Sequence, residues 1–305
     1  MSTGLLGAVT LNLALDVTYE VGELIVGASH RVAAVRQRAG GKGVNVARVA
    51  DVLGYPVLAL GFAGGRTGEV VAADLDESGL NSLLTPIRGE TRRSVAVVDT
   101  SAGDATVFNE AGPRVSEDEW RALCDRMPWS SLGVLACSGS LPPGLPDHAY
   151  AELTARARQH DVPAVVDTTG SALLAAAKTG AVVRANASEL RDAVGSDVLD
   201  GSRQLVAMGA RAAVITDGAD GMVAVLGDRA WRALPVERVS GNPTGAGDAC
   251  TAVVAIAIAE GNDDWPAVLR SAVAASAAAV LTPVAGDIDL EAYRRWLPQV
   301  VVREL

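Results

Sequence analysis

The sequence predicts an α/β fold with a mostly parallel central sheet that helices cover on both faces. Short apolar runs of strand length alternate with segments in which apolar residues recur every three or four positions, a pattern typical of such a sheet. The 305 residues are 49% hydrophobic, enough to bury a large core within one domain spanning residues 1–305. The expected core strands are 57–62, 133–137, 162–166, 181–184 and 212–216.

Two regions interrupt this alternation, at about residues 15–35 and 90–110. Both are rich in β-branched residues with polar alternation, and neither contains a convincing helical pattern. We therefore expect them to pair as a small β-sheet outside the main one. An alanine-rich stretch at 272–280 is instead predicted to be a packed helix.

Composition excludes several classes of partner. The formal net charge is −10 with no basic run, which argues against nucleic acid and anionic membranes, so a phosphorylated ligand would need local arginines. No signal-type segment is recognisable at the N-terminus, and the longest apolar run, around 249–259, is too short to span a bilayer. A cytoplasmic location is the resulting expectation. The three cysteines and three histidines are scattered without metal-ligand spacing.

A glycine-rich turn at 242–247 leads directly into an apolar segment with the character of a buried helix. The first turn of a helix has unpaired N–H groups and partial positive charge. The backbone of Gly245, Ala246 and Gly247 carries no bulky side chain and could bring these donors against a phosphoryl group. The sequence therefore indicates an anion-binding turn.

Asp248 follows this turn immediately. A carboxylate beside a bound anion would be repelled by it, so its chemical use there is to take a proton from a hydroxyl that attacks the phosphorus. An ordinary helix start with an acidic residue in its first turn is the alternative interpretation.

A second glycine cluster occupies 39–47, with the sequence AGGKGVNVA, ahead of a helical pattern. It is not a Walker A loop, because Lys42 is followed by glycine rather than by serine or threonine. Neither cluster matches the dinucleotide fingerprint, which weakens a dehydrogenase interpretation. Lys42 is one of only two lysines in the chain. A solvated turn remains the alternative for this cluster.

Five motifs in order give the sequence a resemblance to the ribokinase family of carbohydrate kinases, phosphofructokinase B type, over nearly the whole chain. Within it the chain most resembles the branch of 1-phosphofructokinase and tagatose-6-phosphate kinase. The motifs are TLNLALD at 10–16, GGKGVNVA at 40–47, GETR at 89–92, SGSLPPG at 138–144 and NPTGAGD at 242–248. DTTGSAL at 167–173 also resembles the 1-phosphofructokinase side. The resemblance implies a three-layer α/β/α fold with a β lid that closes over the sugar and commonly forms a dimer contact.

The resemblance also assigns sugar-binding residues. Asp16 would accept hydrogen bonds from sugar hydroxyls, although a turn aspartate is an equal alternative from the residue alone. Arg31 and Arg92 match positions that bind an existing phosphate on the substrate, and arginine suits bidentate phosphate contacts. Lys42 could assist them. The remaining substrate-binding residues expected from the motifs are Gly40, Gly41, Asn45 and Ser138.

The nucleotide side is expected around two further motifs. Asn186 and Glu189 resemble the Asn-x-x-Glu pattern whose acidic residue organises Mg²⁺ through water, which suits a hard cation. Thr216, Gly218 and Gly221 match the turn that lies along ATP. A helix start and a simple β turn are the respective alternatives.

The chain departs from the family pattern at three places: Leu13 replaces a proline, Arg184-Ala185 replaces Lys-Pro, and Asp217 replaces a leucine. Asp217 puts a negative charge near the ATP phosphates. The resulting expectation is an ATP- and Mg²⁺-dependent kinase, dimeric through its lid, that converts fructose 1-phosphate to fructose 1,6-bisphosphate. Tagatose 6-phosphate, fructose 6-phosphate, an unphosphorylated sugar or nucleoside, or a non-catalytic sensor role stay open as alternatives.

Overall fold

The fold is a three-layer α/β/α sandwich with a separate small sheet, seen in a computed structural model that describes residues 4–305. The large sheet has the order β14-β13-β12-β11-β10-β9-β8-β1-β4-β5. Its strands from β11 to β5 are parallel, whereas β12, β13 and β14 extend one edge with antiparallel pairing. The strands are β1 (Leu5–Thr10), β4 (Val57–Ala63), β5 (Ser82–Pro86), β8 (Leu132–Ser138), β9 (Ala164–Asp167), β10 (Val182–Asn186), β11 (Ala212–Thr216), β12 (Met222–Leu226), β13 (Arg229–Leu234) and β14 (Val301–Glu304).

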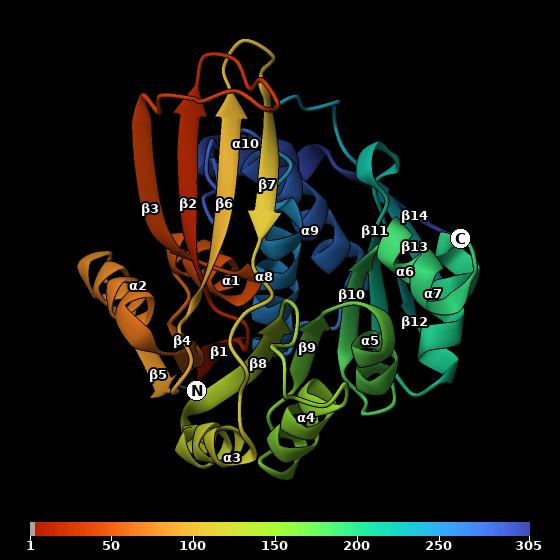
Figure 1. The fold of residues 1–305 in the computed structure, drawn as a ribbon. Coiled ribbons are helices and arrows are strands. Elements are labelled where there is room, and N and C mark those ends of the chain that lie inside the picture. The colour runs from red at the N-terminus through yellow and green to blue at the C-terminus, as the bar shows by residue number, and fades with distance from the viewer. Residues whose placement is uncertain (1–3) are drawn as a thin grey trace.

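Helices cover both faces of this sheet and divide its apolar residues into two cores (Figure 1). Because successive side chains of a strand point to opposite faces, Val134 and Ala136 of β8 join one core while Leu135 and Cys137 join the other. The helices are α1 (Lys42–Val52), α2 (Gly65–Glu77), α3 (Glu117–Arg126), α4 (Ala149–Gln159), α5 (Gly170–Ala177), α6 (Ala187–Val194), α7 (Val198–Ala207), α8 (Ala246–Ala259), α9 (Trp265–Val280) and α10 (Leu290–Trp296), with short 3₁₀ turns η1 (Trp129–Ser131), η2 (Gly218–Asp220) and η3 (Leu297–Gln299).

The small sheet has the order β3-β2-β6-β7 and stands at the edge where the parallel strands end (Figure 1). It is built from β2 (Ala14–Val21), β3 (Ala34–Gly40), β6 (Arg92–Asp99) and β7 (Asp104–Asn109). The two predicted regions therefore do pair as a separate sheet, although 22–33 forms a loop between β2 and β3 rather than strand. β3 also continues beyond residue 35 to the glycine cluster, so the small sheet leads directly into α1.

The five predicted core strands are all present, with ends that differ by at most two residues from those predicted. The predicted alanine-rich helix is the second half of α9, and the apolar segment behind Asp248 is α8. β9 begins at Ala164, after Pro163, whose nitrogen cannot donate to a sheet ladder. No helix among residues 4–305 combines the length and the apolar character needed to cross a membrane.

Candidate active site

One large cavity, of about 1590 Å³, opens between the small sheet and the ends of the parallel strands. This is the edge at which open α/β sheets bind ligands, because the connecting loops diverge there. The lining includes residues from both glycine clusters, both predicted nucleotide motifs and the small sheet. Of the predicted site residues, Asp16, Gly41, Lys42, Asn45, Arg92, Asn186, Glu189, Thr216, Gly218, Gly221, Gly245, Ala246, Gly247 and Asp248 line it.

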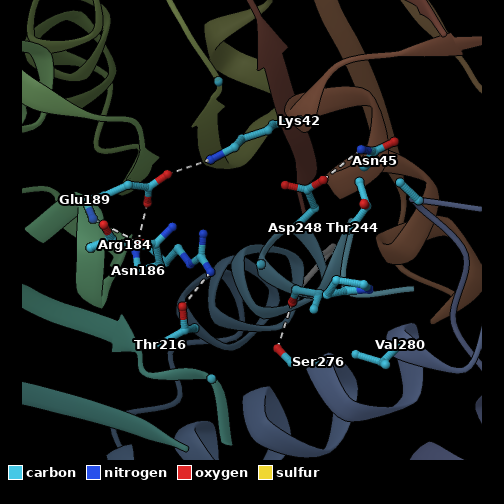
Figure 2. Close-up of a pocket in the computed structure, with 18 of the residues that line it drawn as sticks. Lys42, Asn45, Arg184, Asn186, Glu189, Thr216, Thr244, Asp248, Ser276 and Val280 are labelled. Atoms are coloured by element: carbon cyan, nitrogen blue, oxygen red, sulfur yellow. Dashed lines mark hydrogen bonds and ion pairs between the residues drawn. The ribbon is translucent and has the colours of Figure 1, made fainter. Parts of the chain in front are cut away.

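The two glycine clusters meet at the bottom of the cavity. The Asn45 side-chain amide of α1 donates to Oδ2 of Asp248 in the first turn of α8 at 2.7 Å (Figure 2). Asp248 is only 5% exposed. Burial, together with the neighbouring carboxylate of Asp167, raises the pKa of Asp248 to about 6, although Lys42, Asn45 and Arg184 oppose the shift. A carboxylate with that pKa is ionised near neutral pH and is a stronger base than an exposed aspartate.

The glycine turn presents free backbone donors to the cavity. Gly245 is the N-cap of α8 and has φ 92°, a conformation that favours glycine. The N–H groups of Gly245 and Gly247 have no acceptor among residues 4–305, whereas the Ala246 N–H donates to the Pro243 carbonyl at 3.3 Å. An anion bound here could accept hydrogen bonds from the N–H groups of Gly245 and Gly247. The Ala246 N–H could also donate to it, but only by giving up its long bond to the Pro243 carbonyl.

At the end of the cavity beside the small sheet, Asp16 of β2 lies close to Arg92 of β6. Burial raises the pKa of Asp16 to about 6 against the opposing effect of Arg92 and two further arginines. The Arg92 guanidinium donates through Nε to the Asn12 carbonyl at 3.1 Å and through Nη1 to the Glu110 carbonyl at 3.3 Å. These bonds hold a cation at the cavity wall, beside a carboxylate that can accept hydroxyl hydrogen bonds.

Gly40 does not line the cavity, but it shapes the wall behind Asp16. A Cβ built on Gly40 would overlap the Asp16 carboxylate. The glycine is therefore required for the position of Asp16, because any larger residue there would displace the carboxylate.

The opposite end holds the predicted nucleotide residues. Asn186 and Glu189 form a reciprocal capping box at the start of α6, with both side-chain bonds at 2.8 Å. These two residues therefore do begin a helix, as the alternative interpretation expected. The other carboxylate oxygen of Glu189, Oε1, lies at the cavity wall, 3.6 Å from Lys42 Nζ (Figure 2). Asp217 also lines this end.

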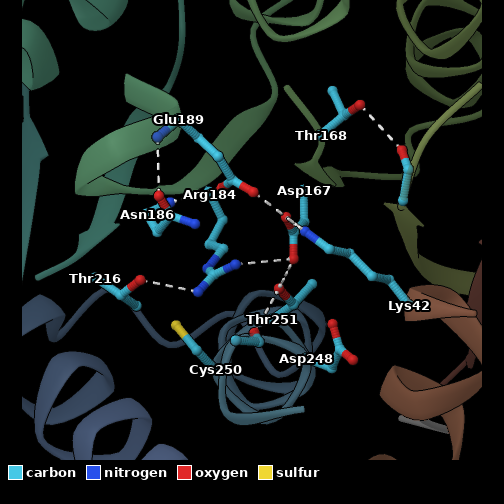
Figure 3. A network of polar contacts seen from close by, with 12 residues as sticks. Lys42, Asp167, Thr168, Arg184, Asn186, Glu189, Thr216, Asp248, Cys250 and Thr251 are labelled. Carbon is cyan, nitrogen blue, oxygen red and sulfur yellow. Dashed lines mark hydrogen bonds and ion pairs between the residues drawn. The ribbon is translucent and has the colours of Figure 1, made fainter. Parts of the chain in front are cut away.

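A buried ionic network, which the sequence did not reveal, lies beneath these residues (Figure 3). Asp167 is fully buried at the end of β9 and accepts from Lys42 Nζ, Arg184 Nη1 and Thr251 Oγ1, each at 3.2 Å. Burial alone would raise the pKa of Asp167, but Arg184 and Lys42 outweigh it and hold that pKa below its usual value. Asp167 belongs to a motif that pointed to the family, yet nothing in the sequence indicated these partners.

Besides Gly40, two predicted substrate residues do not line the cavity. Ser138 is 0% exposed at the end of β8, so its prediction is corrected: its Oγ is buried without a partner among residues 4–305. Ser140, in the turn after the strand, lines the cavity instead and accepts from the Asn12 amide at 3.1 Å. Arg31 is exposed in the loop between β2 and β3, away from the cavity lining of this single chain.

The end of the cavity lined by Asn186 and Glu189 has oxygen donors that would suit a magnesium ion bound to phosphates. Carboxylate and amide oxygens are the ligands Mg²⁺ prefers, and it usually keeps several waters. No cluster of three or more His, Cys, Asp or Glu residues within 4–305 is arranged to hold a metal by itself. The side chain of Glu189, 19% exposed, could contact the ion only as one member of a shell completed by water and nucleotide.

Comparison with known proteins agrees with this arrangement. The chain matches the pattern of the pfkB family of carbohydrate kinases over residues 9–292. Among solved structures it is similar to Escherichia coli phosphofructokinase-2 in complex with potassium, with a TM-score of 0.91 and 27% identity over 97% of this chain and 99% of the other. It also shares its fold with a protein named as a possible 1-phosphofructokinase from Thermotoga maritima (TM-score 0.87, 24% identity, 99% of each chain) and with Arabidopsis thaliana ribokinase complexed with ribose and ATP (TM-score 0.75, 20% identity, 97% and 99%). The family match spans most of the chain, so this protein belongs to the pfkB family of carbohydrate kinases.

Proposed function

We propose that the protein transfers the γ-phosphoryl group of ATP to a ketohexose phosphate, with fructose 1-phosphate as substrate and fructose 1,6-bisphosphate as product. The observation that carries this proposal is the position of Asp248 in one continuous cavity. The buried Asp248 lines the same cavity as the glycine turn that precedes it and as Asp16 and Arg92.

In this reaction Asp248 takes the proton of the attacking hydroxyl while the Asn45 amide holds its carboxylate in place. The N–H groups of Gly245 and Gly247, with Ala246 once its bond to Pro243 exchanges, bind the charge of the transferring group. Mg²⁺ would neutralise the nucleotide phosphates, with Glu189 holding one of its waters and Asn186 beside it. Thr216, Gly218 and Gly221 would lie along the nucleotide.

The sugar phosphate would bind at the other end. Asp16 and Asn45 are placed to accept and donate hydrogen bonds to hydroxyls, and Arg92 supplies the phosphate contact. An arginine at this wall supports a phosphorylated substrate, because a guanidinium can make charge-assisted, bidentate contacts with a phosphate. Lys42 is held by Asp167 and Glu189, so its help in binding the sugar phosphate would require breaking those contacts.

Fructose 6-phosphate is a second candidate substrate, and the comparison with a solved structure supports it. The E. coli phosphofructokinase-2 structure in complex with fructose-6-phosphate is 26% identical, with a TM-score of 0.88. Fructose 6-phosphate, and by similarity of shape tagatose 6-phosphate, are therefore the alternatives for the same cavity.

The deciding experiment measures ADP release with ATP and Mg²⁺ against fructose 1-phosphate, fructose 6-phosphate, tagatose 6-phosphate, fructose and ribose. We expect the highest kcat/KM with fructose 1-phosphate. A preference for fructose 6-phosphate or tagatose 6-phosphate would change the assigned substrate but keep it a ketohexose phosphate. Turnover with fructose or ribose alone would overturn the assignment of a phosphorylated substrate. Absence of turnover with all five compounds, in a protein that still binds ATP, would favour a non-catalytic sensor role.

We also propose a homodimer formed through the small sheet, which would act as a lid over the sugar, in a protein of the cytoplasm, where ATP is available. The sheet and its loop expose large apolar side chains, including Val26 (97%), Val35 (55%) and Phe108 (59%), and such patches commonly mark interfaces. Sedimentation of the wild type and of Phe108→Asp tests this: a dimer that the variant weakens supports the lid contact, and a monomeric wild type contradicts it.

A further inference from the structure

Arg38 connects the small sheet to the loop at 281–287 that follows α9. It lies on β3, an edge strand of the small sheet (Figure 1). Its Nη2 donates to Oδ1 of Asp287 at 2.8 Å, and its Nη1 donates to the Ala285 carbonyl at 3.4 Å. The first of these bonds is charge-assisted and joins residues 249 positions apart. The guanidinium therefore ties the small sheet to a segment of the main body.

The loop at 281–287 supports the glycine turn. A Cβ built on Gly245 would lie 3.0 Å from Cα of Ala285, which is closer than most real Cβ contacts. In the same turn, the side chain of Asn242 donates to the Pro283 carbonyl at 3.1 Å, and its backbone N–H donates to the Val280 carbonyl at 2.9 Å. A shift of this loop would therefore move the backbone that is proposed to bind the transferring phosphoryl group.

The loop also contacts the residue that holds the proposed base. Gly286 has φ 85°, and a Cβ built on it would lie 3.0 Å from Oδ1 of Asn45. The amide of Asn45 donates to Asp248 at 2.7 Å. One short loop thus packs against both the glycine turn and the partner of the catalytic carboxylate.

On the small sheet, Arg38 is the direct cross-strand partner of Asp16. Residues paired in this way present their side chains on the same face of a sheet. Burial raises the pKa of Asp16, and the charge of Arg38, after that of Arg92, opposes this rise. The guanidinium that holds the loop is therefore also a neighbour of the carboxylate proposed to bind sugar hydroxyls.

A second ion pair on the same strand shows what is particular to Arg38. Arg36, two positions earlier, pairs with Glu20 of β2, so both partners belong to the small sheet. Its side chain is 63% exposed, against 26% for that of Arg38. An exposed pair within one sheet contributes little to stability, whereas a pair that bridges two parts of the molecule also fixes their relative position.

We propose that Arg38 is a positioning residue for phosphoryl transfer: together with Asp287 it fastens loop 281–287 to the small sheet and so keeps the glycine turn and the base in place. This inference rests on the proposed kinase function. Because the side chain of Asp287 is 42% exposed, the pair is a modest one and its loss should have moderate effects. A displaced turn lowers kcat more than it weakens binding, because the placement of its donors matters most in the transition state.

The first test follows hydrogen–deuterium exchange in the protein without ligands, so it does not depend on turnover. Arg38→Met should speed exchange in peptides covering 281–287 and 242–250 by about threefold to fivefold, the factor by which losing a modest ion pair raises the population of an open state. Arg36→Met is the matched control and should leave both peptides unchanged. Unchanged exchange at 242–250 in Arg38→Met would overturn the proposal, because Arg38 would then hold only the loop.

The second test measures steady-state kinetics with ATP and the sugar phosphate that the wild type prefers. Arg38→Met and Asp287→Asn should each lower kcat about 3–10-fold, with both KM values within about twofold of wild type. The double variant should lose no more than either single variant, because each change already breaks the same pair. Arg38→Lys, which can keep the ion pair but not both bonds, should recover part of the loss.

Three kinetic results would contradict the positioning role: losses that multiply in the double variant, an equal loss of kcat in Arg36→Met, or wild-type kcat in Arg38→Met. A wild type that phosphorylates no sugar of the panel would instead end the proposed function. The exchange comparison would still decide whether Arg38 holds the glycine turn, so the two failures can be distinguished.

Discussion

The Asn45 amide and the Asp248 carboxylate are 203 positions apart in the sequence and 2.7 Å apart in the structure. Their hydrogen bond joins the helix after the first glycine cluster to the helix after the second. Because the bond leaves Asp248 in a single orientation within a buried setting, it converts two separate loop motifs into one candidate catalytic centre.

Replacing Asp248 by asparagine should remove the base while keeping its shape. The amide oxygen can still accept from Asn45, so the site should stay assembled. We expect kcat to fall by about 10²–10⁴, with the Kd of ATP close to that of wild type. Steady-state kinetics and calorimetry measure the two quantities, and turnover near the wild-type value would end the assignment of Asp248 as the base.

The pKa of Asp248 near 6 also predicts a pH dependence of activity. A base works only when ionised, so kcat should be constant above about pH 7 and fall about tenfold per pH unit below 6. The residual activity of Asp248→Asn should lack this decline and provides the control, because the substrate phosphate titrates identically in both assays. The same decline in both proteins would assign it to the substrate or to Asp16.

As pH rises, the activity of the wild type should rise, but its free energy of unfolding should fall relative to that of Asp248→Asn. In the folded state the pKa of Asp248 is about 6, against the ordinary aspartate value of 3.8. Between pH 3.8 and pH 6, Asp248 is therefore protonated in the folded protein but ionised in the unfolded chain. This stabilising difference disappears as pH rises through 6, where the buried carboxylate ionises. Asp248→Asn should therefore gain on the order of 2–3 kcal/mol relative to wild type between pH 4 and pH 7.5. Urea unfolding at the two pH values measures the gain, and an equal difference at both would contradict it.

The fold and most of the residues that line the cavity could be predicted from the sequence, for identifiable physical reasons. Strand-length apolar runs such as 212–216 are expected to be buried, and a glycine turn before an apolar helix such as α8 leaves backbone N–H groups free to bind an anion. The Asp167, Lys42 and Arg184 network could not be predicted in this way, since it depends on the register in which β9 and β10 pair. Ser138 and Ser140 illustrate a related limit: Ser138 is the last residue of β8 and is buried, whereas Ser140 lies beyond the end of the strand and lines the cavity, so the outcome depends on where the strand ends.

Gly40→Ala tests the wall behind Asp16. The new Cβ would overlap the Asp16 carboxylate, which must then move away from the sugar. We expect KM for the sugar substrate to rise at least about tenfold, the cost of about 1.4 kcal/mol of lost binding, with little change in KM for ATP. Gly22→Ala is the matched control, because no atom lies within 4 Å of its Cβ position in the same small sheet region. An unchanged sugar KM in Gly40→Ala would show that Asp16 does not hold the substrate.

Arg92→Ala addresses the feature that separates a sugar-phosphate kinase from a sugar kinase. Arg92 is held at the cavity wall by the Asn12 and Glu110 carbonyls, and a charge-assisted bond to phosphate contributes about 1.5–3 kcal/mol. KM for the phosphorylated sugar should therefore rise about 10–100-fold, while KM for ATP changes little. Loss of the neighbouring cation should also raise the pKa of Asp16 further, since Arg92 is the largest influence that lowers it.

Arg31→Ala is the companion variant, because Arg31 lies outside the cavity of the single chain. If the phosphate is bound by Arg92 alone, Arg31→Ala should leave KM for the sugar phosphate within about twofold of wild type. A rise in both variants would mean that the loop carrying Arg31 reaches a substrate site in the assembled protein, and this result would connect substrate binding to the proposed dimer. Insensitivity of both variants would instead favour an unphosphorylated substrate, because neither arginine would then have a phosphate to bind.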